Sequence, residues 1–177
     1  MGGSFQALAT AQGEEFVREC VLALTRAGFE VVGERVDLVD TGCEVDLLAR
    51  GATGVVFYIE CKGSFMRRPG LQRTDTLRKA IANMALIHHR GYGALMLMTS
   101  HRPAGGRGTV ALQLAHEIAR FVVIVPRDDF AELRRLAAAD AGTLGARWGL
   151  AVGAPVAREL AHAGDGQAAR LGQLGLF

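Results

Sequence analysis

The chain has 177 residues, half of them hydrophobic, and a formal net charge of +2 at pH 7. This composition indicates a globular rather than a disordered chain, and the length is sufficient to bury one core. No apolar run approaches the roughly 20 residues of a membrane-spanning helix, and the start lacks a basic region followed by an apolar stretch, so we expect a cytoplasmic protein.

The first half of the chain predicts one helix followed by two strands. Residues 12–29 predict an amphipathic helix that ends at Gly28, with apolar positions at Phe16, Val17, Cys20, Leu22 and Leu24. Residues 29–39 and 43–50 then predict two strands, because the turn signal Asp40-Thr41-Gly42 separates them.

A third strand is predicted at residues 55–62, where VVFYIECK has five apolar residues before two opposite charges. An uninterrupted apolar run is typical of a strand that is covered on both faces. Because a strand has a period of two, Glu60 and Lys62 are expected on one face and Cys61 on the other. The cysteines Cys20, Cys43 and Cys61 are odd in number and lack metal-ligand spacing, which favours buried thiols in a reducing cytoplasm.

The second half predicts alternating helices and strands after a basic loop. A helix is predicted at residues 74–91, with Thr74 or Asp75 as its cap and Gly91 as its stop; its expected core positions are Leu77, Ile81, Met84 and His88. One histidine of the pair His88-His89 is expected in the core and the other in solvent.

Strands at residues 92–100 and 121–126 and helices at residues 108–120 and 127–139 complete the predicted order, and Asp128 or Asp129 is expected to cap the last helix. The order α-β-β-β-α-β-α-β-α predicts an α/β fold with a mixed sheet and helices on both faces. We expect a domain over residues 1–140 and an Ala/Gly-rich, partly helical extension or linker over residues 141–172.

Charge is unevenly distributed along the chain. Residues 1–60 hold ten acidic and four basic side chains, whereas residues 62–107 hold nine basic side chains against Asp75 alone. Such a segment suits a polyanion that lies across the end of the third strand, and the alternative is a solvated helix face with two basic loops. The candidate DNA-binding residues are Arg67, Arg68, Arg73, Arg78 and Lys79.

Two carboxylates are expected to meet at the end of the third strand. An antiparallel pairing of residues 43–50 with residues 55–62 brings Asp46 beside Glu60, with Lys62 next to both. Two carboxylates with a main-chain carbonyl form a hard-oxygen site that suits Mg²⁺, and Glu15 or Glu14 of the first helix could add another. The alternative is a surface ion pair between Glu60 and Lys62, with Asp46 as a solvated turn residue.

Asp46, followed by Glu60-x-Lys62 at the end of an apolar strand, resembles the PD-(D/E)xK nuclease superfamily, in the branch of Holliday-junction resolvases and type IV restriction endonucleases. The resemblance covers residues 12–126; it departs from the pattern at Val45, where a proline is usual. It implies the restriction-endonuclease-like three-layer fold, with a central mixed β-sheet flanked by helices. It also implies a metal-dependent DNA endonuclease that uses Mg²⁺ or Mn²⁺.

By that resemblance, Asp46, Glu60 and the main-chain carbonyl of Cys61 would bind the metal. Lys62 would be the catalytic lysine and Glu15 the carboxylate of the first helix. Many relatives are dimers that cut two strands, so a homodimer is one expected state. The alternatives are a restriction or phage-defence nuclease, and a non-catalytic DNA-binding or adaptor protein that kept the fold.

The chain ends in QLGLF, which is similar to the motif that binds the bacterial sliding clamp (the DNA polymerase III β subunit). Leu176 and Phe177 would fill an apolar pocket of the clamp, and polar contacts would hold Gln173, with Leu174 between them. Residues 173–177 are therefore the expected clamp-binding motif, which indicates a role in DNA repair or replication. The alternative is that these residues pack on the chain's own core.

Overall fold

The computed structural model describes residues 3–63, 70–116, 118, 121–125 and 130–148. The helices are α1 (Gly3–Ala27), α2 (Thr74–His89), α3 (Gly106–Leu114), α4 (Ala131–Ala138) and α5 (Ala141–Trp148), with one short 3-10 helix, η1 (Gly70–Gln72). The strands are β1 (Glu30–Leu38), β2 (Cys43–Arg50), β3 (Val56–Lys62), β4 (Leu95–Thr99) and β5 (Phe121–Ile124). The predicted order of elements is confirmed over these residues, and α5 follows it.

The five strands form one mixed sheet in the order β1-β2-β3-β4-β5. The first three strands are antiparallel neighbours, whereas β3, β4 and β5 run parallel. Parallel neighbours need a crossover connection, and α2 and α3 provide the two crossovers. β3 therefore lies at the centre, with an antiparallel partner on one side and a parallel partner on the other.

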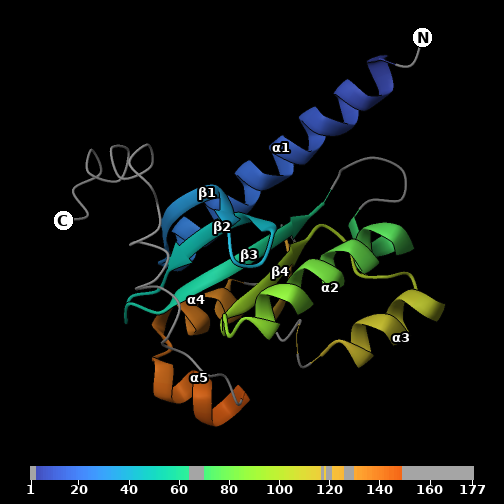
Figure 1. Cartoon of the computed structure of the whole chain (residues 1–177). Coiled ribbons are helices and arrows are strands. Elements are labelled where there is room, and N and C mark those ends of the chain that lie inside the picture. The colour runs from blue at the N-terminus through green and yellow to red at the C-terminus, as the bar shows by residue number, and fades with distance from the viewer. Residues whose placement is uncertain (1–2, 64–69, 117, 119–120, 126–129, 149–177) are drawn as a thin grey trace.

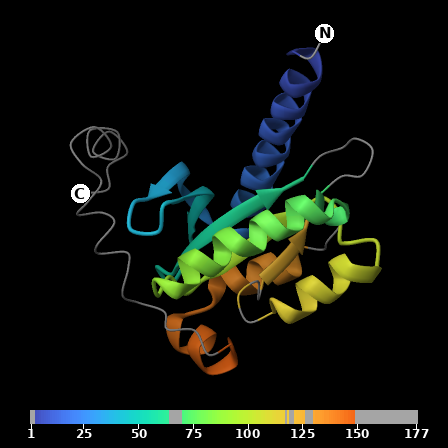
Figure 2. The same cartoon turned by 45° about the vertical axis from the view of Figure 1, so that its right-hand side comes forward.

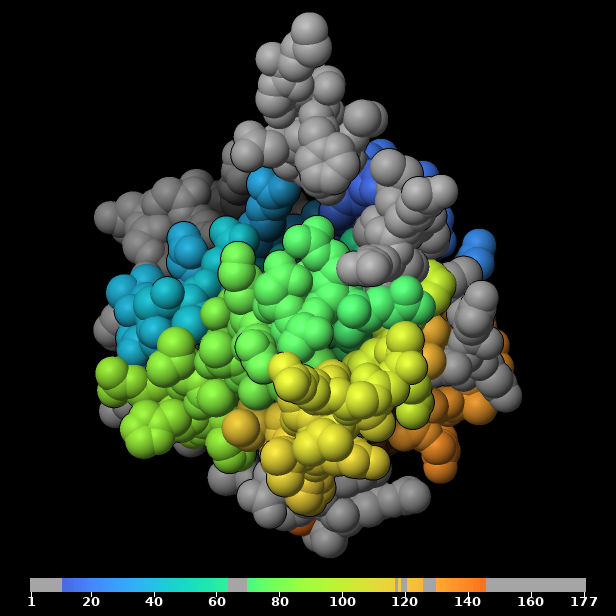
Figure 3. All heavy atoms as spheres, turned by 90° about the vertical axis from the view of Figure 1, so that its right-hand side faces the viewer, coloured from blue at the N-terminus to red at the C-terminus, as the bar shows by residue number. Residues whose placement is uncertain are grey.

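Helices cover both faces of the sheet, which makes the protein α/β (Figure 1). One core contains α1, α4 and α5 packed on Phe57, Ile59, Met96 and Met98. The other contains α2 and α3 packed on Tyr58, Leu95 and Leu97, and Figure 3 shows these two helices side by side on that face of the molecule. Neighbouring residues of β3 and β4 thus enter opposite cores, as expected for strands that are covered on both faces.

The first helix is longer than predicted. α1 begins at Gly3 rather than near residue 12, and its N-terminal part projects away from the sheet (Figures 1 and 2). Of the apolar positions expected for this amphipathic helix, Phe16, Cys20 and Leu24 are buried, but Leu22 is 49% exposed and does not lie on the buried face. Leu22 lies two residues from both Cys20 and Leu24, which is about 200° around a helix and therefore on the opposite side. The helix ends at Gly28, whose φ of 98° is left-handed.

The boundaries and core of α2 correct several predictions. The N-cap is Arg73 without a side-chain cap, so neither Thr74 nor Asp75 is the capping residue. The buried positions are Leu77, Ala80, Met84 and Ile87. His88 and His89 are both exposed and Ile81 is only partly buried, because Ile87 faces the sheet in place of His88. Gly91, with φ of 91°, ends the turn after α2 as predicted.

The later elements are shorter than predicted. α3 ends at Leu114 rather than at residue 120, and Phe130 occupies the N-cap of α4; Asp128 and Asp129 lie outside the described residues. The Asp140 carboxylate accepts a hydrogen bond from the main-chain N of Thr143 at 2.6 Å and so caps α5, whose Leu144 is buried in the same core as α1. Among the described residues, no helix is long and apolar enough to cross a membrane.

Candidate active site

Asp46 and Glu60 lie on neighbouring antiparallel strands. The pairs Leu47↔Ile59 and Leu48↔Tyr58 set the register of β2 and β3, and the same register continued by one position places Asp46 opposite Glu60. The local cause is the short turn at residues 51–55, which returns the chain from β2 into β3 and is closed by a hydrogen bond from Gly51 N to Val55 O at 2.8 Å. The sequence-based expectation that the two carboxylates meet at the end of β3 agrees with this register.

The β1–β2 pairing is locally distorted at Arg35 and Asp46, whereas the shift of its register lies between Val31 and Gly33. Val36 pairs with Val45 and Glu34 with Leu47, and between these pairs lie Arg35 and Asp46. Val45 packs in the core under α2, whereas Leu47 packs in the core under α1, so the alternation of faces breaks between them. Arg35 has φ of 51°, the only positive φ of a non-glycine residue in the described part of the chain.

The irregularity allows the Asp46 carboxylate to reach the main chain at the end of β3. Its Oδ2 atom accepts a hydrogen bond from the main-chain N of Cys61 at 2.6 Å. The Cys61 side chain lies on the opposite face, in the core with Cys20 of α1. Hydrogen bonding to Cys20 and burial raise the pKa of the Cys61 thiol well above its ordinary value. Cys61 therefore contributes only main-chain atoms to this site.

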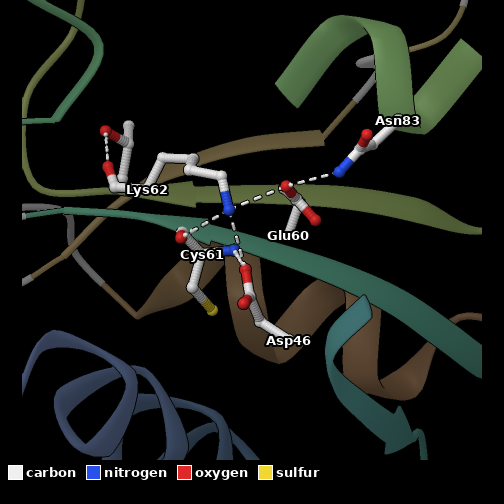
Figure 4. A network of polar contacts seen from close by, with 6 residues as sticks. Asp46, Glu60, Cys61, Lys62 and Asn83 are labelled. Carbon is white, nitrogen blue, oxygen red and sulfur yellow. Dashed lines mark hydrogen bonds and ion pairs between the residues drawn. The ribbon is translucent and has the colours of Figure 1, made fainter. Parts of the chain in front are cut away.

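The Lys62 ammonium lies among three oxygen atoms (Figure 4). Its Nζ is 2.7 Å from Glu60 Oε1, 3.1 Å from Asp46 Oδ2 and 3.2 Å from the main-chain O of Cys61. The chain contains only two lysines, and the other, Lys79, is exposed on α2. Three oxygens from two strands thus converge on a single cation.

Burial sets the electrostatics of this cluster. The Glu60 side chain is 3% exposed, so the Glu60–Lys62 pair is not a surface ion pair. Burial raises the pKa of Glu60; Lys62 opposes this rise and Asp46 adds to it, and the net pKa is raised. Burial alone would lower the pKa of Lys62, but Asp46 and Glu60 outweigh it and the net pKa is raised. Lys62 is therefore an ammonium at neutral pH.

The donor set suits a hard divalent cation. Two carboxylates and a main-chain carbonyl are oxygen ligands of the kind that Mg²⁺ prefers, and they already surround the positive charge of Lys62. Among the described residues, no three His, Cys, Asp or Glu side chains gather into a metal-binding group. Any metal here would therefore depend on the carbonyl of Cys61 in addition to Asp46 and Glu60.

A hollow of about 560 Å³ lies beside this cluster, between α1 and the β1–β2 hairpin. Its charged lining consists of Glu14 and Arg18 of α1, Glu34 and Arg35 of β1, and Asp46 and Lys62 of the site. Both Glu14 and Glu15 are exposed on α1, but the structure places only Glu14 beside the site, because Glu15 does not line the hollow. The residues of α1 that line the hollow are Gly13, Glu14, Val17 and Arg18. At about 100° per residue they span roughly 140° of the helix circumference, and Glu15 falls outside that arc.

The end of β3 is held by two contacts. The hydroxyl of Thr99 on β4 donates to the main-chain O of Lys62 at 2.8 Å. Gly63 follows, and a Cβ at this position would lie 2.3 Å from the ring of buried Phe16. Glycine is therefore needed here for α1 to pack directly over the end of β3 and form the wall of the hollow.

The sequence carries only a weak signal for Asn83 and Thr99, two further residues at the site. Asn83 of α2 lies 3.5 Å from Glu60 Oε1 through its amide nitrogen (Figure 4), and its spacing of four residues from Lys79 was the available signal. A polar residue that ends the apolar run LMLMT was the signal for Thr99. Nothing in the sequence indicates that Arg35 lies at the site.

The predicted DNA-binding residues fall into two groups. Arg73, Arg78 and Lys79 are exposed at the start of α2, and Arg73 forms an exposed ion pair with Asp75 at 3.2 Å. Arg67 and Arg68 lie outside the described residues, as do Gln173, Leu174, Leu176 and Phe177 of the predicted clamp-binding motif, so these assignments stay predictions.

Comparison with known family models, with curated proteins and with solved structures returns no match for this chain.

Proposed function

We propose that this protein is a metal-dependent DNA endonuclease with the restriction-endonuclease-like fold. The observation that carries the proposal is the convergence of Glu60 Oε1, Asp46 Oδ2 and the Cys61 carbonyl on one cation, at 2.7–3.2 Å. The order of elements and the mixed five-stranded sheet flanked by helices support the fold assignment. The resemblance of Asp46 and Glu60-x-Lys62 to the PD-(D/E)xK pattern supports the reaction.

In this proposal, Asp46, Glu60 and the Cys61 carbonyl hold Mg²⁺ or Mn²⁺, which would activate water and neutralise charge on the phosphate. Because these oxygens now surround Lys62, binding of the metal requires the ammonium to move away. The lysine side chain is flexible, and it would remain near a phosphate that contacts the metal. As an ammonium it donates hydrogen bonds and stabilises negative charge, and it is not a general base at neutral pH.

Two further groups orient this machinery. Asn83 approaches the Glu60 carboxylate from α2, and Thr99 holds the main chain of Lys62. Both are positioning residues, since each acts through a proposed ligand or the catalytic lysine. The terminal QLGLF motif adds the proposal that the enzyme is tethered to the bacterial sliding clamp during DNA repair or replication.

The test is cleavage of labelled single-stranded, duplex, flap, mismatched and four-way DNA with Mg²⁺ or Mn²⁺. Wild-type protein is expected to cut at least one of these substrates, and EDTA should abolish the activity. Asp46→Ala, Glu60→Ala and Lys62→Ala should each remove cleavage. Glu44→Ala is the matched control, because Glu44 is exposed on the same strand as Asp46. Cleavage that survives EDTA, or survives all three substitutions, would refute the proposal.

A further inference from the structure

Arg35 combines a costly main-chain conformation with a position at the candidate site. Its φ of 51° lies in the left-handed region, which residues with a side chain rarely adopt. Such conformations persist where the surrounding structure enforces them, and they concentrate at functional sites. Arg35 lies between the pairs Glu34↔Leu47 and Val36↔Val45, as does Asp46, so the two residues lie at the same point of the β1–β2 hairpin.

Arg35 lines the hollow together with Asp46 and Lys62. There, Arg35 Nη2 forms an ion pair with Glu14 Oε1 of α1 at 3.3 Å. The Arg35 side chain is 67% exposed and the Glu14 side chain 50% exposed. Exposed ion pairs contribute little to stability. The guanidinium can therefore exchange the Glu14 carboxylate for another anion at small cost.

The chemistry of Arg35 indicates which anion that is. A guanidinium stays charged at all relevant pH values and binds phosphate oxygens through two parallel hydrogen bonds. A DNA strand with one phosphate at Lys62 must continue along the neighbouring surface, and on the α1 side that surface is the hollow. The cations Arg18, Arg35 and Lys62 are balanced there by Glu14, Glu34 and Asp46. Because these charges balance, the described lining of the hollow has no broad positive potential. A phosphate would therefore be recognised by direct hydrogen bonds from the Arg35 guanidinium.

We propose that Arg35 binds a phosphate next to the one that is cleaved, so that the DNA strand runs through the hollow between α1 and the β1–β2 hairpin. This inference rests on the proposed nuclease function. It adds a phosphate contact outside the basic segment of residues 62–107, on the opposite side of Lys62 from α2.

The test is the salt dependence of DNA binding, measured by fluorescence anisotropy with a labelled duplex in EDTA so that hydrolysis does not compete. Each phosphate contact contributes about one to the slope of log K against log salt concentration. Arg35→Gly should weaken binding at every salt concentration and lower the slope by about one. Arg35→Lys keeps the charge and should retain the slope.

Arg50→Ala is the matched control. Arg50 lies at the other end of the same hairpin and forms a similar ion pair, with Glu30 at 3.3 Å, but it does not line the hollow. Its replacement should leave the slope unchanged. Glycine adopts positive φ without strain, so Arg35→Gly should melt at or above the temperature of the wild type, which separates lost binding from unfolding.

The outcomes distinguish this inference from the proposed function. If wild-type protein binds DNA and Arg35→Gly keeps the full slope and affinity, the inference is wrong and the nuclease proposal stands. If Arg35→Gly and Arg50→Ala lower the slope equally, the contact is not specific to the hollow and the inference is also wrong. If wild-type protein binds no DNA, both the inference and the proposed function fail.

Discussion

Replacing Lys62 with methionine removes the ammonium that three oxygens share and keeps a long side chain at the same position. The Glu60 carboxylate, which is 3% exposed, loses its ion-pair partner at 2.7 Å. Asn83 at 3.5 Å is then the hydrogen-bond donor that the structure places near it. Asp46 is 25% exposed and can recover part of its hydration, so the main cost falls on Glu60.

The size of this effect follows from the burial of the pair. Removing one partner of a buried ion pair costs about 3–5 kcal/mol, and the 24% exposure of Lys62 argues for the lower end, about 3 kcal/mol. For a protein of this size, a loss of 1 kcal/mol lowers Tm by about 2–4 °C. We therefore expect Lys62→Met to melt about 6–12 °C below the wild type at pH 8 without metal.

The pH dependence provides a sharper test. The variant keeps burial and Asp46, which raise the pKa of Glu60, and loses Lys62, which lowers it. An acid whose pKa is higher in the folded state destabilises the protein above its unfolded pKa, and this cost disappears as pH falls through the folded pKa. The gap in Tm between wild type and variant should therefore shrink from pH 8 to pH 5.

Thermal melts in EDTA at several pH values measure this gap, and Lys79→Met is the matched control because Lys79 is the other lysine and is exposed. The control should melt like the wild type throughout. A Lys62→Met variant that melts like the wild type at pH 8, or a gap that stays constant down to pH 5, would refute the reasoning.

Three further predictions concern the site and the tail. Because burial raises the pKa of Glu60, the contribution of Glu60 to stability falls as pH rises above about 4.5. Glu60→Gln should remove this contribution, raise Tm at neutral pH in EDTA and abolish cleavage, and a lower Tm would contradict the assignment. Gly63→Ala places a Cβ 2.3 Å from the Phe16 ring, so urea unfolding should show a loss of about 1–3 kcal/mol, whereas Gly13→Ala, with nothing within 4 Å of its Cβ, should not. Deletion of residues 173–177 should abolish binding to purified sliding clamp in a titration and leave Tm and clamp-free cleavage unchanged; a lower Tm with no clamp binding would favour packing on the chain's own core.

The order of elements and the pairing of Asp46 with Glu60 could be predicted from the sequence because local patterns carry them. The apolar run of β3 and the Gly-Ala-Thr-Gly sequence at residues 51–54, directly before it, are local signals of a strand and of the turn that joins β2 to β3. The period of two then places Glu60 and Lys62 on one face, and the antiparallel hairpin supplies the neighbour. Each step depends on the alternation of side chains along a β-strand, which is the same for any sequence.

The ends and buried faces of the helices, and the residues of α1 that line the hollow, could not be predicted in this way. The cap of α2, the exposure of Leu22 and His88, and the choice of Glu14 over Glu15 depend on how each helix is rotated against the sheet. That rotation is set by packing between residues distant in sequence, such as Phe16 against Gly63, and local propensity is weaker than such packing.

Arg35 is the clearest example of a site residue that could not be predicted from the sequence. In the sequence it is one of 18 arginines, within a segment that reads as an ordinary strand. Its left-handed conformation and its place in the hollow beside Asp46 appear only in the folded hairpin. The sequence by itself thus determined which side chains could form a cation site at the end of β3, since strand periodicity is local. Only the tertiary structure decided which charges surround that site, because packing between α1 and the hairpin brings them together.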